Sequence, residues 1–248
     1  MRANRKTAAS RKKAPRAPAF PASDTVRREW LRRVEAEYRS AAITQHLGLW
    51  LIQLGAPPTL IADSRRIVAD EMIHSEKSYA VFVAAGGDGA PALARETLGL
   101  ARSPASLEHD VARAAVEVFC LGETVAVRLF KRLRQECTVP VARRALDRIL
   151  RDEVRHREFG WILLEWLLST PLEADLRALL ARELTAMLRR VRANYGVDAA
   201  ATHRAPPFED TARAWGLMPI GDYAAAVQET FERDYAPRFA GLGFVVRT

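Results

Sequence analysis

Hydrophobic positions recur every three or four residues over most of the chain, which is the spacing of one face of an α-helix. We find no run of alternating Val, Ile and Thr between turn residues, so strands are not expected. The pattern predicts six helices and an all-α fold. They are expected over residues 23–55, 58–85, 106–135, 139–169, 172–195 and 222–239, with one further short helix near 92–98.

Turn-forming residues mark where these helices end. Gly55-Ala-Pro-Pro58 stops the first helix, and Gly86-Gly87-Asp88-Gly89 stops the second. The first and second helices are therefore joined by a short connection, as are the third and fourth, whereas residues 86–106 form a long one. These lengths favour a four-helix bundle with a single crossover. We expect this bundle over residues 23–169, with one or two extra C-terminal helices over 172–248 in the same domain.

The positive charge of the chain is concentrated at its N-terminus. The whole chain of 248 residues has a formal charge of +8, but residues 1–20 contain seven basic residues and no acid. The other residues are nearly balanced, with 31 basic and 30 acidic side chains. Residues 1–22 are predicted to be a disordered basic tail, because they have too few apolar side chains to bury. A solubilising role is favoured for the tail, and nucleic acid is not an expected partner.

Cysteine content and hydropathy exclude several other classes. The only cysteines are Cys120 and Cys137, and neither belongs to a CxxC pair, so neither a disulfide framework nor a zinc ribbon is expected. The N-terminus lacks the apolar segment of a secretory signal. Charged residues interrupt every apolar stretch well before 18 residues, so no membrane helix is expected. A cytoplasmic location is the default expectation.

The sequence Asp-Glu-x-x-His occurs twice, at residues 70–74 and 152–156, each time within a predicted helix. Glu and His at positions i and i+3 project from the same side of a helix. In both segments that side is otherwise apolar, so Glu71, His74, Glu153 and His156 are expected to be buried. Buried carboxylates are costly unless something pairs with them, and a metal ion could do so. The alternative is a surface salt bridge within each motif.

The other two helices of the bundle each supply one more carboxylate on an apolar face. These are Glu123 in the third helix and Glu37 in the first, with Glu35 on a competing face as the alternative to Glu37. Four Glu and two His in this order form the ligand set of a dinuclear carboxylate site, in which glutamates bridge two metals and each histidine binds one. Two aspartates are candidates to orient the histidines across the bundle, Asp70 for His156 and Asp152 for His74, or else they are exposed acids.

With these residues the chain resembles the ferritin-like di-iron carboxylate superfamily over about residues 30–168. The resemblance implies a ferritin-like four-helix bundle in which Glu37, Glu71, His74, Glu123, Glu153 and His156 bind two iron ions, with manganese or a mixed pair as the alternative. It also implies O2, or else peroxide, as co-substrate. The segment RDEVRHREFGWILLEWLL and the C-terminal RFAGLGF are locally similar to the aldehyde-deformylating oxygenases.

Three positions depart from particular branches of the superfamily. Ser78 stands where the ribonucleotide reductase small subunit has Tyr, Val127 where bacterial hydrocarbon monooxygenases have Thr, and Ile149 where arylamine N-oxygenases have an extra His. The expected function is a di-iron oxidase or oxygenase acting on a small organic substrate. A separate reductase is expected to supply electrons, and a homodimer is compatible with this function. The alternatives are a ferroxidase or iron-storage protein and a metal-free helical interaction protein.

Overall fold

The computed structural model describes residues 22–195 and 208–246, and all regular secondary structure in these two ranges is helical. The basic tail predicted to be disordered lies outside the described residues, apart from Ala22. So do residues 196–207, which follow the predicted helix 172–195. None of the helices in the described ranges has both the length and the apolar character needed to cross a bilayer.

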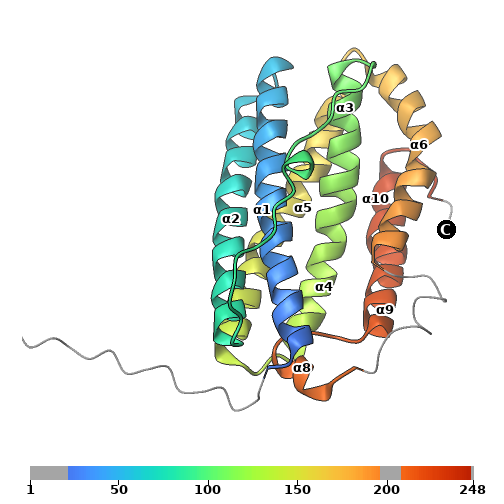
Figure 1. Cartoon of the computed structure of the whole chain (residues 1–248). Coiled ribbons are helices and arrows are strands. Elements are labelled where there is room, and N and C mark those ends of the chain that lie inside the picture. The colour runs from blue at the N-terminus through green and yellow to red at the C-terminus, as the bar shows by residue number, and fades with distance from the viewer. Residues whose placement is uncertain (1–21, 196–207, 247–248) are drawn as a thin grey trace, which may run out of the picture.

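Four long helical stretches run side by side (Figure 1). They are α1 (Asp24–Gln53), α2 (Pro58–Ala84), a third stretch in three parts, and α5 (Pro140–Leu167). The three parts are α3 (Leu107–Ala114), η2 (Ala115–Glu123) and α4 (Thr124–Gln135). These bounds agree with the predicted ones to within two residues.

Local chemistry explains where these helices begin and end. The Ser23 side chain accepts a hydrogen bond from the Val26 backbone N–H at 3.4 Å, which caps the start of α1. Pro58 and Pro140 occupy the first positions of α2 and α5, where no helical N–H is required. After α1 the backbone turns through Gly55 with φ of 67°, a conformation that glycine adopts without steric cost.

The long connection from α2 to α3 passes over α1 (Figure 1). The backbone N–H of Leu100 donates to Nδ1 of His46 at 3.0 Å, and Arg39 donates to the Thr97 hydroxyl at 3.2 Å. The short helix expected near 92–98 is only a 3₁₀ turn, η1 (Arg95–Thr97). No residue of η1 is buried, so packing does not favour a longer helix there.

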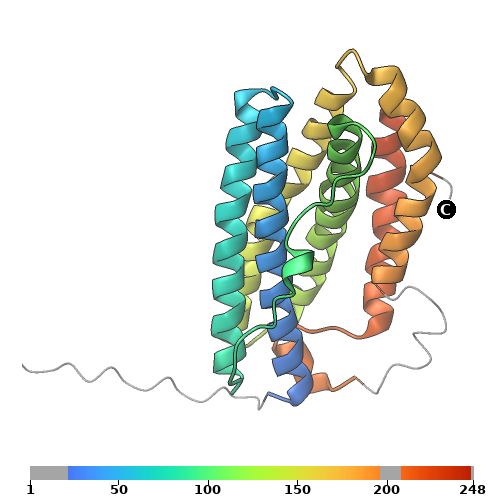
Figure 2. The same cartoon turned by 45° about the horizontal axis from the view of Figure 1, so that its top comes forward.

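Two further helical stretches form a second layer beside the third stretch, on the side away from α1 and α2 (Figure 2). They are α6 (Glu173–Asn194) and a final stretch made of α9 (Ile220–Thr230), η3 (Phe231–Tyr235) and α10 (Ala236–Gly241). The short helix α8 (Asp210–Ala214) lies at the end of the bundle near the start of α1 (Figure 1). α9 packs on α4, and α6 packs on α3 and η2. The five-residue helix α8 falls between the predicted helices 172–195 and 222–239, where no helix was predicted.

Two helical stretches contain π-helical segments that the hydrophobic pattern does not predict. η2 interrupts the third stretch, and η3 interrupts the last one. A π turn holds more residues than an α turn and is often found at functional sites. Most of η2 is buried, as are Phe231 and Tyr235 of η3, and Tyr235 is hydrogen-bonded to η2. The two irregular segments are therefore in contact with each other.

Candidate metal centre

All six predicted ligands are buried near the middle of the bundle. Glu37 comes from α1, Glu71 and His74 from α2, Glu123 from the end of η2, and Glu153 and His156 from α5. The exposed fraction of these residues ranges from 0% for the two histidines to 8% for Glu123. Four separate stretches of the chain thus direct polar side chains into one apolar core.

The six side chains form two overlapping groups of four. Glu37, Glu71, His74 and Glu153 make the first group, and Glu71, Glu123, Glu153 and His156 make the second. Within each group, one ligand atom from every residue lies within 4.8 Å of all the others. Glu71 and Glu153 belong to both groups, so these two carboxylates are common to two adjacent candidate cation positions.

Each histidine directs Nδ1 toward the glutamates. Nδ1 of His74 lies 3.2 Å from Oε2 of Glu71 and 3.7 Å from carboxylate oxygens of Glu37 and Glu153. Nδ1 of His156 lies 3.4 Å from Glu71 and 3.6 Å from Glu153. The imidazole nitrogens therefore occupy the same central space as the carboxylate oxygens.

The opposite ring nitrogen of each histidine faces an aspartate on the other motif. Nε2 of His74 lies 3.0 Å from Oδ2 of Asp152, and Nε2 of His156 lies 3.5 Å from Oδ2 of Asp70. Both aspartates are buried. A carboxylate on Nε2 holds the proton there and leaves the Nδ1 lone pair free for a cation.

Two arginines of α5 join the aspartates to each other. Arg148 and Arg155 each donate to both Asp70 and Asp152. Arg155 is 2.7 Å from Asp70 and 3.0 Å from Asp152. The side chains of these arginines are partly exposed, so the network extends from solvent to the buried histidines. The two guanidinium charges balance the two aspartate charges.

The structure distinguishes between the two glutamates proposed for α1. Glu37 joins the cluster, whereas Glu35 accepts a hydrogen bond from the backbone N–H of Ala92 at 2.9 Å. Glu35 therefore anchors the crossover connection on α1. Ser40, one turn further along α1, donates its hydroxyl to Oε1 of Glu71 at 2.8 Å.

The cluster raises the pKa values of Glu37, Glu123 and both histidines, and its histidines lower the pKa of Glu71. Burial raises the pKa of Glu37 to about 8, and the nearby Glu71 charge adds to the effect. Burial also raises the pKa of Glu123 well above its usual range. For His74, burial alone would lower the pKa, but the nearby carboxylates of Glu37 and Glu71 outweigh it and raise the pKa to about 11. Without a cation, the cluster therefore holds protons to limit repulsion among its carboxylates.

The donor set fits two divalent cations. Oε2 of Glu153 and Nδ1 of His156 are buried without a hydrogen-bond partner, and they lie 3.6 Å apart. Buried polar atoms are rarely left unpaired, so these atoms are suited to a ligand. Four glutamate charges match the charge of two divalent ions. Carboxylate and imidazole ligands suit iron and manganese.

Several residues that support this site were not found from the sequence. Ser40, Arg148 and Arg155 look like ordinary polar residues of helix surfaces. Arg148 and Arg155 could have been found from their spacing, since they lie four residues before and three after Asp152, on the same side of α5. Ser40 gave no such signal. Cys120, three residues before Glu123, is a fully buried thiol in the hydrophobic core.

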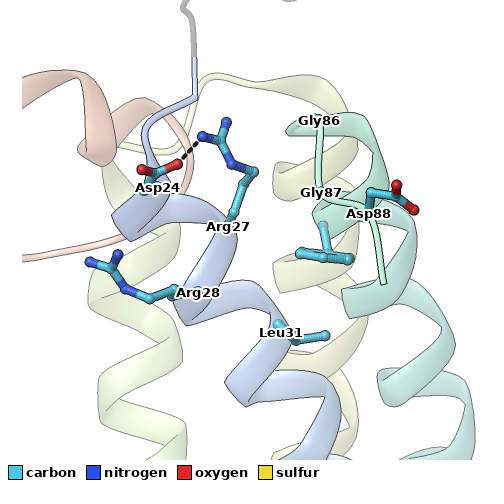
Figure 3. A pocket seen from close by; sticks show the side chains of 8 residues that line it. Asp24, Arg27, Arg28, Leu31, Gly86, Gly87 and Asp88 are labelled. Atoms are coloured by element: carbon cyan, nitrogen blue, oxygen red, sulfur yellow. Dashed lines mark hydrogen bonds and ion pairs between the residues drawn. The ribbon is translucent and has the colours of Figure 1, made fainter. Parts of the chain in front are cut away.

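A surface pocket of about 280 Å³ lies at the start of α1, apart from the cluster (Figure 3). Leu31, Arg28 and Gly87 are among the residues that line it, and Asp24 forms an ion pair with Arg27 at its edge. None of the six clustered residues lines this pocket. Its lining therefore adds nothing to the metal centre.

In comparisons with protein-family models, curated proteins and solved structures, the chain has no significant match. The assignment of function therefore rests on the geometry of the cluster.

Proposed function

We propose that the chain is a ferritin-like di-iron carboxylate oxidoreductase that uses O2 to oxidise a small organic substrate. The observation that carries this proposal is the pair of four-residue groups that share Glu71 and Glu153. The order Glu, Glu-x-x-His, Glu, Glu-x-x-His along four long helices, with a crossover after the second, supports a ferritin-like bundle. Manganese in one or both positions is compatible with the same ligands.

In this proposal the six residues divide into bridging and terminal ligands. Glu71 and Glu153 would bridge the two ions. Glu37 and His74 would complete one position, and Glu123 and His156 the other. When bound, the iron pair would supply the redox chemistry that activates O2.

The protein would contribute orientation, charge balance and exclusion of water. Asp70 and Asp152 hold the Nε2 protons of the histidines, so that Nδ1 remains a donor to the cation. Ile67, Phe119 and Ile149 each precede one of the glutamates by one helical turn and are buried. Their side chains keep water from the reacting groups. We expect a separate reductase to deliver the electrons.

The test is iron binding followed by exposure to O2. Metal-free protein is titrated with Fe(II) under anaerobic conditions, bound iron is counted, and the absorbance change after mixing with O2 is followed by stopped flow. We expect about two irons per chain and a rapid absorbance change in the wild type. Glu153→Gln should lose both ions, because both groups share this residue. Glu37→Gln should lose one ion, and Glu35→Gln, its matched control on the same helix, should keep both.

Three results would change the conclusion. Absence of iron binding, or equal binding by all three variants, would refute the metal centre. Iron binding with no reaction toward O2 would refute the oxidase. Continued oxidation of Fe(II) far beyond two ions per chain, in a particle of cage size, would identify an iron-storage protein instead.

A further inference from the structure

The residues on either side of Glu123 are hydrogen-bonded to other helices, and these bonds hold the backbone that carries Glu123. Glu71 receives a hydrogen bond from Ser40, and each histidine faces an aspartate. Around Glu123, by contrast, the hydrogen bonds from other helices end on Leu121 and Thr124. The direction of the Glu123 carboxylate thus depends on the backbone that carries it.

Tyr235 provides the first of these contacts. Its hydroxyl donates to the backbone carbonyl of Leu121 at 2.5 Å, over a separation of 114 residues in sequence. The tyrosine is fully buried, and the edge of its ring packs against Phe231 at 5.0 Å between centroids. Burial raises the pKa of the Tyr235 phenol well above its usual range, so the hydroxyl keeps the proton that it donates.

Trp161 provides the second contact from another side. Its indole N–H donates to the Thr124 hydroxyl at 3.1 Å, and both residues are buried. Trp161 is itself packed against Phe239 of α10, with ring centroids 4.9 Å apart. Glu123 therefore lies between two residues that are hydrogen-bonded to different parts of the structure.

The π-helical form of η2 makes these contacts important. Accommodating one extra residue in a helical turn rotates the residues that follow by about 100° relative to a continuous α-helix. Glu123 is the last residue of η2, so its direction changes if the π turn relaxes to α-helical form. A side chain rotated by that amount would leave the second group of ligands.

We propose that Tyr235 is a positioning residue for Glu123. Its hydrogen bond to the Leu121 carbonyl holds the end of η2 in π-helical form, so that the Glu123 carboxylate reaches the cation position shared with Glu71, Glu153 and His156. This inference rests on the proposed metal centre and gives the C-terminal helices a defined role: they shape one of its two positions.

The test compares Tyr235→Phe with Tyr223→Phe. Both variants remove a phenol hydroxyl from the same helical stretch, and Tyr223 has no side-chain hydrogen bond to η2 in the described residues. Metal-free protein is titrated with Mn(II), and the free ion and the magnetically coupled pair are measured by electron paramagnetic resonance. In Tyr235→Phe we expect the second Mn(II) to bind about tenfold more weakly and the coupled signal to fall, with the first Mn(II) unaffected. Tyr223→Phe should behave as the wild type.

Trp161→Phe is a second, independent variant, because it removes the other contact beside Glu123. It should also weaken the second ion selectively, and circular dichroism confirms that each variant is folded. Tight binding of both ions by Tyr235→Phe would overturn the inference. Equal weakening of both ions would overturn it too, because the hydroxyl would then serve the fold as a whole. Failure of the wild type to bind any Mn(II) or Fe(II) would refute the metal centre itself.

Discussion

Gly160 of α5 lies at a close approach between α5 and η2. A Cβ atom added at this position would lie 2.5 Å from Cβ of Phe119 and 2.8 Å from the backbone N of Cys120. Ordinary contacts begin near 3.4 Å, so α5 and η2 would have to separate by about 0.9 Å, the shortfall at Phe119. These atoms belong to the backbone or are fixed to it, so rotation of a side chain cannot relieve the overlap. We therefore predict that Gly160→Ala destabilises the fold.

The size of the effect follows from two opposing contributions. Overpacking a core costs about 1–3 kcal/mol, and the rigid atoms here place the cost near 3. Replacing Gly by Ala within a helix returns about 1 kcal/mol through helix propensity. The net loss is about 2 kcal/mol. For a chain of this size, that corresponds to a fall in Tm of about 4–8 °C.

Thermal and urea unfolding of wild type and variant measure this loss directly. Gly221→Ala is the matched control, because Gly221 is exposed in the first turn of α9 and an added Cβ meets nothing within 4 Å. That change should leave stability equal to the wild type or raise it by up to about 1 kcal/mol. If Gly160→Ala were as stable as the wild type, the close approach of α5 to η2 would be refuted.

Other predictions concern the periphery of the site and the start of α3. Asp152→Asn should weaken metal binding about 10–100-fold, because the amide no longer holds the Nε2 proton of His74 as a carboxylate does; a competition titration with a chromophoric chelator measures it. Mn(II) at about 100 times its Kd should stabilise the wild type by about 2.7 kcal/mol, and differential scanning fluorimetry should show no such shift in His74→Ala. Burial would raise the pKa of Asp110, but hydrogen bonds from Ser103 outweigh it and hold the pKa below its usual value. This stabilisation is complete above the unfolded pKa of about 3.9 and is lost as the pH falls through the folded value. Asp110→Asn should therefore cost about 1–3 kcal/mol at pH 7, and urea unfolding should show the difference shrinking below about pH 4.

Much of the helical architecture could be predicted because its signals are local. Helix ends at Ser23, Gly55 and Pro58 depend on capping and backbone preferences that a few neighbouring residues determine. The helical periodicity also placed Glu and His of each repeated motif on an apolar side, where the structure has them buried. Local signals did not decide whether Glu37 or Glu35 belongs to the cluster. Two faces of the same helix carried apolar residues, and the crossover that occupies Glu35 is distant in sequence.

The features that were missed depend on contacts between distant segments. The π-helical form of η2 has no signature in the apolar pattern. The contacts that accompany it, a hydrogen bond from Tyr235 and the close approach of Gly160, come from residues distant in sequence. The role of Arg155 likewise depends on Asp70, which lies on another helix.

The sequence by itself determined the all-helical character, the main helix boundaries and the six residues with the chemistry for a metal pair. Those properties follow from side-chain type and periodicity, which act over one or two helical turns. Only the tertiary structure decided which carboxylates belong to both groups of four, which aspartates face the histidines, and where the third helical stretch takes π-helical form. These depend on distances of a few ångströms between segments up to 114 residues apart, and packing in three dimensions sets such distances.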